Sequence, residues 1–195
     1  MPPDPPELGN LALDFLHTRR RARGGAIDLV RTPDALVAWL VTHAGEPTAS
    51  RLMGPLEPPI GRLLLEEARR LRGDIGTLVE TYAASGSLHP VASYGINRLL
   101  EAGPRSLRLV TEAGSPALVE TLHARGHLGP LVVIAEAAAH LVSTVEPGRV
   151  RACASAACGA WFADTSKGGR RRWCSMARCG NRQKASAHRA RGRTG

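Results

Sequence analysis

The sequence predicts a mainly α-helical protein with small β elements, an α+β fold in which a helical N-terminal domain precedes a small domain holding four cysteines. Three observations support this fold class. Apolar residues recur at helical spacing through most of the first 145 residues, all four cysteines fall near the C-terminal end, and the excess positive charge gathers there too. With 195 residues, 43% of them hydrophobic, the chain can bury a substantial core. We place the domains at 1–147 and 148–195, because Pro147-Gly148 separates regions of different charge.

The first two expected elements are helices. Apolar residues fall on one helical face over Leu8–Arg21, which predicts a helix there. Thr32-Pro33-Asp34 supplies an N-cap, a proline at the first helical position and an acid in the first turn. We therefore expect a second helix that runs through Trp39 and stops near Gly45.

A long amphipathic helix should follow the Pro/Gly-rich stretch 54–59. Its apolar residues alternate steps of four and three, and they are Leu64, Ala68, Leu71, Ile75, Leu78 and Tyr82. Gly73 and Gly76 lie inside it and each costs about 1 kcal/mol relative to alanine, so tertiary packing should hold the helix together.

The rest of the N-terminal domain should contain two more helices and a hairpin. A helix is expected over Val91–Ala102, ending at Gly103-Pro104. Ser106–Thr111 and Ala117–Leu122 flank a turn-rich segment and predict a two-stranded hairpin. The apolar segment Leu131–Val145 predicts a final helix.

The N-terminal domain shows no pattern typical of an enzyme. It contains neither a glycine-rich phosphate loop nor a nucleophile elbow, so we expect no enzymatic activity. His123 and His127 have metal-ligand spacing but fall in a glycine-containing loop, and we interpret them as solvated. His17 and His140 lie on apolar helical segments and are expected to be partly buried rather than ligands.

The sequence also predicts where the protein works. Its first residues lack the basic and apolar stretches of a secretory signal, and no apolar run approaches the ~18 residues of a membrane span. We therefore expect a cytoplasmic protein without a membrane partner, associated with the nucleoid if it binds DNA. In that reducing compartment, four cysteines indicate metal or thiol chemistry rather than disulfides.

The net charge of +9 is divided unevenly. Residues 1–148 hold 14 Lys and Arg against 16 Asp and Glu, whereas residues 149–195 hold 12 against Asp164 alone. A basic segment attached to a neutral domain is typical of a polyanion-binding module.

The four cysteines predict a zinc site. Cys153 and Cys158 form one pair, and Cys174 and Cys179 form a second pair after a fifteen-residue insert. Tetrahedral Zn²⁺ takes four thiolates, which two local pairs can supply, and such a closed site is structural rather than catalytic. The alternatives are a redox dithiol, two disulfides and an iron–sulfur cluster; paired spacing favours one structural zinc ion.

The segment around the cysteines should form a β-hairpin and a helix. Trp161–Thr165 and Arg170–Trp173 are expected as strands joined by a glycine turn, and a basic helix should begin after Cys174. This small domain has few large apolar side chains, so the metal should supply most of its folding free energy.

Two families resemble this chain. The segment containing Trp161-Phe162-Ala163-Asp164, Arg172-Trp173-Cys174-Ser175 and Cys179-Gly180-Asn181-Arg182 resembles the CGNR zinc finger. The N-terminal domain resembles the ABATE domain of bacterial proteins labelled stress-induced transcription regulators, through Leu11-Ala12-Leu13-Asp14-Phe15 and Ile96-Asn97-Arg98-Leu99-Leu100. His17-Thr18 departs from the Asn-Thr expected there. The resemblance implies a helical domain followed by a zinc finger, and a presumed role in DNA binding.

These observations lead to one functional expectation with an alternative. We expect a zinc-dependent DNA-binding protein, a bacterial transcription regulator whose N-terminal domain receives a signal from a small-molecule or protein ligand. The alternative is a protein-interaction or RNA-binding adaptor with a purely structural zinc site. Asn181 and Arg182 are the best candidates for base contact, although both could instead support the zinc site. The candidate nucleic-acid-binding residues are Arg170, Arg171, Arg172, Arg178, Asn181, Arg182, Lys184, His188, Arg189 and Arg193. The DNA target, the signal and the oligomeric state stay open.

Overall fold

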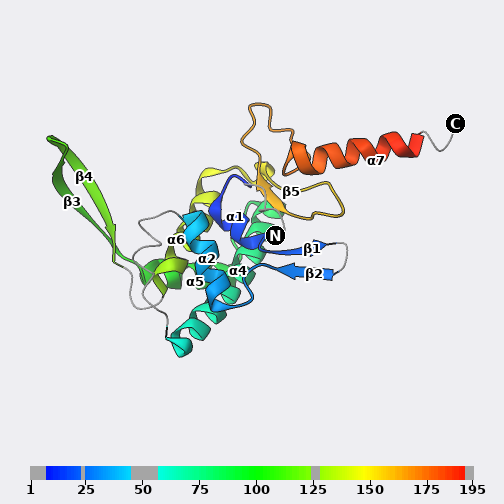
Figure 1. Ribbon diagram of the computed structural model, residues 1–195. Helices are drawn as coiled ribbons and strands as arrows, with labels where there is room; N and C mark the ends of the chain where they lie inside the picture. The colour runs from blue at the N-terminus through cyan, green and yellow to red at the C-terminus, as the bar shows by residue number, and fades with distance from the viewer. Residues whose placement is uncertain (1–7, 23–24, 45–56, 124–127, 192–195) are drawn as a thin grey trace.

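The computed structural model describes residues 8–22, 25–44, 57–123 and 128–191, and all statements below concern these residues. Five helices form the centre of the molecule, and each of its three sheets is a single antiparallel pair of strands (Figure 1). The helices are α1 (Leu11–Leu16), α2 (Pro33–Ala44), α4 (Pro58–Ser85), α5 (Pro90–Glu101) and α6 (Gly129–Thr144). The mainly helical fold with small β elements is confirmed.

Helix α4 is the central element. Its apolar face is buried against α1, α2, α5 and α6, and Leu71, Ile75 and Val79 are almost fully enclosed. The helix ends at Gly86, whose left-handed backbone lets its N–H donate to Tyr82 O at 2.8 Å. The long amphipathic helix expected from the sequence is thus confirmed, extended by several residues at its N-terminal end.

Two further helices and the hairpin are also confirmed. Thr32 caps α2 by accepting a hydrogen bond from Ala35 N at 3.2 Å. Helix α5 covers the expected segment, and β3 (Arg105–Glu112) pairs with β4 (Ser115–Leu122) in one continuous register. This hairpin projects away from the helices in Figure 1 and exposes Leu107, Leu109 and Leu118. Helix α6 begins two residues before the predicted start.

The expected helix over Leu8–Arg21 is wrong in its second half. Helix α1 stops at Leu16, and the chain continues as β1 (Arg19–Ala22), paired with β2 (Gly25–Asp28). Arg72 of α4 explains the change. Its buried guanidinium donates to Thr18 Oγ1 at 2.9 Å and to both carboxylate oxygens of Asp28, at 2.8 and 2.6 Å. This network holds the start of β1 and the end of β2 together at the open end of the hairpin, where Arg19 pairs with Asp28.

The histidines differ in their environments. His17 is 7% exposed, whereas His140 is exposed, contrary to expectation. His123 is exposed and contacts Ser106 Oγ through its Nε2 at 2.6 Å; His127 lies outside the described residues.

The C-terminal region folds around a third pair of strands. β5 (Val150–Ala152) follows a short 3₁₀ turn, η2 (Pro147–Arg149), and pairs with β6 (Trp161–Ala163). The expected pairing of Trp161–Thr165 with Arg170–Trp173 is therefore wrong: Arg172 O instead accepts a hydrogen bond from Ala154 N at 2.8 Å. A π-helical turn, η3 (Met176–Gly180), leads into α7 (Asn181–Arg191), which extends away from the helical centre (Figure 1).

The C-terminal region and the N-terminal helices share one apolar core. Phe162 and Val150 are buried in the same cluster as Leu78 and Ile134. The N–H of Ala163 donates to Leu8 O at 3.1 Å, which ties β6 to the segment before α1. The division at residues 147 and 148 stays a prediction, since both sides contribute to this core.

Among the described helices, none has both the length and the apolar character needed to cross a membrane.

We expect Arg72→Ala to lower the free energy of unfolding by about 3 kcal/mol, because it leaves the Asp28 carboxylate without its guanidinium. Burial would raise the pKa of Asp28, but its hydrogen bonds with Arg72 and Val30 N hold the pKa below the ordinary value. The stabilisation should thus be present above about pH 4 and be lost as pH falls through the lowered pKa.

The measurement is urea denaturation of both proteins across this pH range. Arg70→Ala is the matched control on the same helix, since Arg70 forms an exposed pair with Glu67 and should cost less than about 1 kcal/mol. Equal losses for the two variants would contradict the role assigned to Arg72.

Candidate metal centre and basic surface

The four cysteine sulfurs lie together. The Sγ atoms of Cys153, Cys158, Cys174 and Cys179 are all within 4.8 Å of one another. Cys158 Sγ is 3.6 Å from Cys174 Sγ, which is 3.7 Å from Cys179 Sγ. Zn–S bonds of about 2.3 Å in a tetrahedron place sulfurs about 3.8 Å apart, so the residues present fit a zinc ion.

Two turns bring the cysteines to this point. Cys158 closes the turn that follows β5: its N–H donates to Ser155 O at 2.8 Å, and its sulfur accepts a hydrogen bond from Ala160 N. Cys179 lies in the π-helical turn, where its N–H donates to Ser175 O at 2.9 Å. Each local pair thus comes from a hydrogen-bonded turn.

The thiols interact strongly when no cation is present. A hydrogen bond from Cys174 lowers the pKa of Cys158 to about 5. The same hydrogen bond, burial and the neighbouring thiolates raise the pKa of Cys174 well above its ordinary value, and burial with the Cys158 charge raises the pKa of Cys179 to about 11. Four thiolates cannot coexist here without a cation to balance them, which favours a metal ion.

Asp164 organises the loop between β6 and Cys174. Its carboxylate is buried and accepts hydrogen bonds from Ser166 N (3.1 Å), Ser166 Oγ (2.6 Å) and Arg171 N (2.8 Å). Burial alone would raise the pKa of Asp164, but these hydrogen bonds hold it below the ordinary value. The sequence marked Asp164 only as the single acid of the basic segment, and that isolation was the available signal.

Three arginines of the basic segment are engaged within it. Arg149 donates to Asp164 O and Ser166 O, and Arg151 donates to Gly148 O and Arg171 O. Arg171, a predicted nucleic-acid-binding residue, donates to Cys174 O and lies over the Phe162 ring at 5.0 Å. These guanidinium groups hold the fold of the loop.

The other candidate residues are placed differently. Arg170, Arg172, Asn181, Arg182 and Lys184 are exposed, and Arg178 is half-buried. None of the cations among them has an acidic partner within the described residues. His188 and Arg189 belong to α7, and Arg193 lies outside the described residues.

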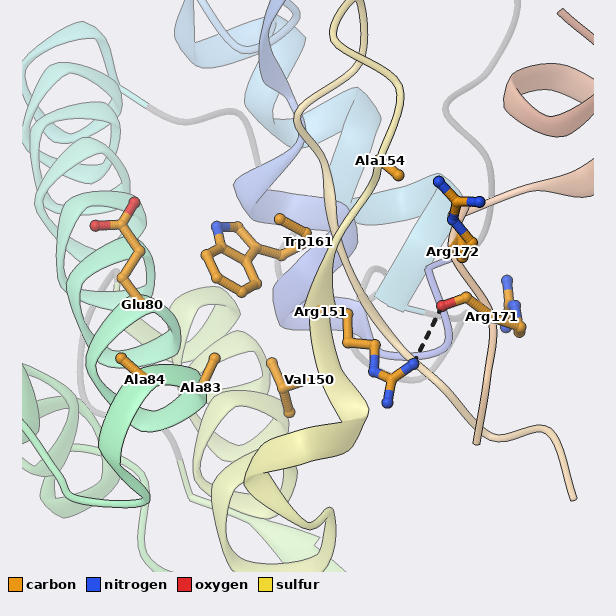
Figure 2. Close-up of a pocket in the computed structure, with 10 residues that line it drawn as sticks. Glu80, Ala83, Ala84, Val150, Arg151, Ala154, Trp161, Arg171 and Arg172 are labelled. Carbon is orange, nitrogen blue, oxygen red and sulfur yellow. Dashed lines mark hydrogen bonds between the residues drawn. The ribbon is translucent and has the colours of Figure 1, made fainter. Parts of the chain in front are cut away.

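Two hollows lie where the C-terminal region meets the helices. Figure 2 shows one, of about 480 Å³, between Ala83 and Ala84 of α4 and the strand that carries Val150 and Arg151. The other, of about 360 Å³, lies beside His17, Arg20 and Cys158. Trp161 and Glu80 line both hollows. Both hollows thus lie at the border between the N-terminal domain and the C-terminal region.

Two family models match the chain in order. The model described as "Putative stress-induced transcription regulator", the ABATE domain, matches residues 9–145, and the model of the CGNR zinc finger matches residues 149–192. A curated mouse protein, Nucleolar protein 9, is 31% identical over 132 residues, which are 67% of this chain. The chain spans 18% of the length of that protein.

We expect Asp164→Ala to lower the free energy of unfolding by about 2 kcal/mol, because it leaves half-buried donors of Ser166 and Arg171 without their acceptor. Since the folded-state pKa is lowered, the contribution should be full above about pH 4 and disappear as pH falls through that pKa. Chemical denaturation of the zinc-loaded protein checks both statements.

Thr165→Ala is the matched control, because Thr165 is the exposed neighbour. It should change stability by less than about 0.5 kcal/mol. A loss for Asp164→Ala as small as that of the control would contradict the loop assignment.

Proposed function

Since the chain belongs to the ABATE family and carries a CGNR zinc finger, we propose that it is a zinc-dependent DNA-binding protein that regulates transcription. One zinc ion per chain, bound by Cys153, Cys158, Cys174 and Cys179, has a structural role, because four thiolates leave no open coordination position. The N-terminal domain receives a signal, and the protein has no enzymatic activity.

The main support for this proposal is that the zinc finger exposes basic side chains and no acidic ones. Residues 149–195 contain 12 Lys and Arg and one acid, and the carboxylate of that acid, Asp164, is only 1% exposed. The finger therefore presents positive charge without an exposed acidic side chain. A surface of this kind attracts the phosphate backbone of a nucleic acid.

The cations without an acidic partner in the described part of the chain come from the loop and from α7. Arg170 and Arg172 come from the loop that Asp164 organises, whereas Arg182 and Lys184 lie on α7. Arg178 lies in the π-helical turn that leads into α7 and is half-buried, whereas Arg182 on α7 is exposed. Duplex DNA bound along this surface would meet phosphate contacts from the loop and the helix together.

The start of α7 is suited to reading bases. Asn181 and Arg182 are exposed in its first turn, and α7 extends free of the helical centre (Figure 1). In helix-based DNA recognition, residues near the N-terminus of the helix contact base edges in the major groove. Arginine pairs with guanine and asparagine with adenine.

One observation favours the alternative adaptor function. The β3–β4 hairpin exposes Leu107, Leu109 and Leu118 by 64, 78 and 66%, and exposed apolar clusters are typical of protein-binding sites. Competition between duplex DNA, structured RNA and heparin separates the two functions, because equal displacement by all three indicates a general polyanion surface.

We expect purified protein to contain one zinc ion per chain. Cys174→Ser should abolish zinc binding and lower the melting temperature, because Cys174 is the buried cysteine between Cys158 and Cys179. Elemental analysis and thermal unfolding are the measurements. Ala177→Ser, a substitution of an exposed residue in the same segment, should keep both properties; iron or no metal in the wild-type protein would refute the site.

Binding to duplex DNA should weaken steeply with salt. About six phosphate contacts predict a slope of log K against log salt near −5, and replacing one contacting arginine should flatten it by about one unit. Arg182→Ala at a base contact should instead cost ~1–3 kcal/mol mainly at the preferred sequence, whereas Arg170→Ala should weaken all sequences alike.

The controls use zinc-loaded protein and fluorescence anisotropy at several salt concentrations. Arg62→Ala, an exposed arginine of α4, should leave affinity and slope unchanged. If affinity and slope also stay unchanged when Arg170, Arg172, Arg178 and Arg182 all become alanine, the DNA-binding proposal fails.

A further inference from the structure

The smaller hollow at the border of the two regions is lined by three separate segments of the chain, and we call it the seam hollow. It measures about 360 Å³, at the lower end of the range typical of small-molecule sites. The end of α1 and strand β1 form one side, α4 the second, and the turn that carries Cys158 the third. The polar and aromatic side chains that line it are His17, Arg19, Arg20, Glu80 and Trp161.

His17 is buried in this wall without a partner for its ring. It is 7% exposed, and neither ring nitrogen forms a hydrogen bond with the described residues. Neither ring nitrogen is among the fully enclosed side-chain atoms that lack a partner, so a ligand or water in the hollow can reach the ring. The imidazole has two ring nitrogens, and either can form a hydrogen bond with a ligand in the hollow.

The two arginines of the seam hollow carry positive charge without an acidic partner among the described residues. Arg20 is half-buried and close enough to His17 to act on its charge. Elsewhere in the N-terminal domain, Arg72 and Arg105 both pair with carboxylates. Glu80 is the single acid lining the hollow, and it lies on α4, across from β1. The β1 side therefore offers unpaired positive charge to an anion.

Trp161 supplies a flat apolar surface between the two hollows. Figure 2 shows its indole from the other hollow, close to Glu80 of α4. In that larger hollow Arg151 and Arg171 already donate to backbone carbonyls, and Arg172 lies over the Trp173 ring at 5.3 Å, so its cations are engaged within the protein. The seam hollow thus combines free cationic groups with one face of an aromatic ring.

We propose that the seam hollow binds a small organic anion, about the size of one aromatic ring with a carboxylate or phosphate group. Arg20, assisted by Arg19, holds the anionic group, the His17 ring hydrogen-bonds to it, and Trp161 packs against the apolar part. Because its walls come from both matched regions, the ligand contacts the ABATE domain and the zinc finger together. This binding does not depend on the DNA-binding proposal and goes beyond it.

Isothermal titration of the full-length, zinc-loaded protein tests the proposal. Benzoate and phenyl phosphate are the anionic probes, and benzamide is the neutral probe of matched shape. We expect at least one anion to bind at millimolar concentration or below and benzamide to bind at least about tenfold more weakly. The two anions distinguish a carboxylate ligand from a phosphate ligand.

Substitutions of residues that line the seam hollow test whether the anion binds there. Arg20→Met keeps the length of the side chain and removes its charge, and should weaken anion binding about tenfold or more. Arg62→Met removes one charge from an exposed position on α4 and should change nothing. His17→Phe is a second test if Arg20→Met does not fold, and zinc content with circular dichroism confirms the integrity of each variant.

Two results would overturn the proposal. One is the absence of binding by either anion. The other is equal binding by wild type and by the folded Arg20→Met or His17→Phe variant. Loss of DNA binding alone would leave the proposal intact, since titration with the probes contains no DNA.

Discussion

Four cysteine sulfurs gathered within 4.8 Å of one another impose the constraint on which the C-terminal region depends. Without a cation, the hydrogen bond with Cys158 raises the pKa of Cys174 and burial raises the pKa of Cys179, whereas a metal ion favours all four thiolates. The strands beside them are three residues long and pair only with each other. Such short strands contribute little stability alone, so the metal ion and the shared core must hold the finger in its shape.

The shared core extends this constraint to the rest of the molecule. Phe162 and Ala163 are buried among residues of the N-terminal helices, and Leu8 accepts a hydrogen bond from β6. A change in the metal site should therefore reach the ABATE domain through packing. The reverse also holds: a ligand in the seam hollow would touch Trp161 and the turn that carries Cys158. Under the proposed function, this border is where a signal could alter the finger.

The arginines of the finger have two different tasks. Arg149, Arg151 and Arg171 donate to backbone carbonyls and hold the loop around Asp164. Arg170, Arg172 and Arg182 are exposed and have no acidic partner within the described structure, and Arg172 lies over the Trp173 ring. The backbone carbonyls that accept the hydrogen bonds of the first three arginines are neutral, and Asp164 is the single acid among residues 149–195. Most of the positive charge of the arginines in this segment is therefore not balanced by negative charge within it. The loop can thus be rigid and strongly basic at once, which suits binding to a polyanion.

The sequence by itself determined the local elements and the composition of the metal site. Helical spacing identified α4, because it buries one continuous face, and the apolar segment Leu131–Val145 identified α6. The cap at Thr32-Pro33-Asp34 identified α2, Gly103-Pro104 marked the end of α5, and turn residues identified β3 and β4. The paired cysteines were sufficient for the metal site, since each pair closes a local turn. Tertiary structure alone decided the rest. Arg72, distant in sequence, turns the segment after α1 into β1, and β5 replaces the expected partner of β6 because Asp164 and Ala154 hold the following loop elsewhere. The seam hollow joins His17 to Trp161, which are separated by more than 140 residues, and no periodicity or spacing can indicate such a contact, because it depends on how separate elements pack.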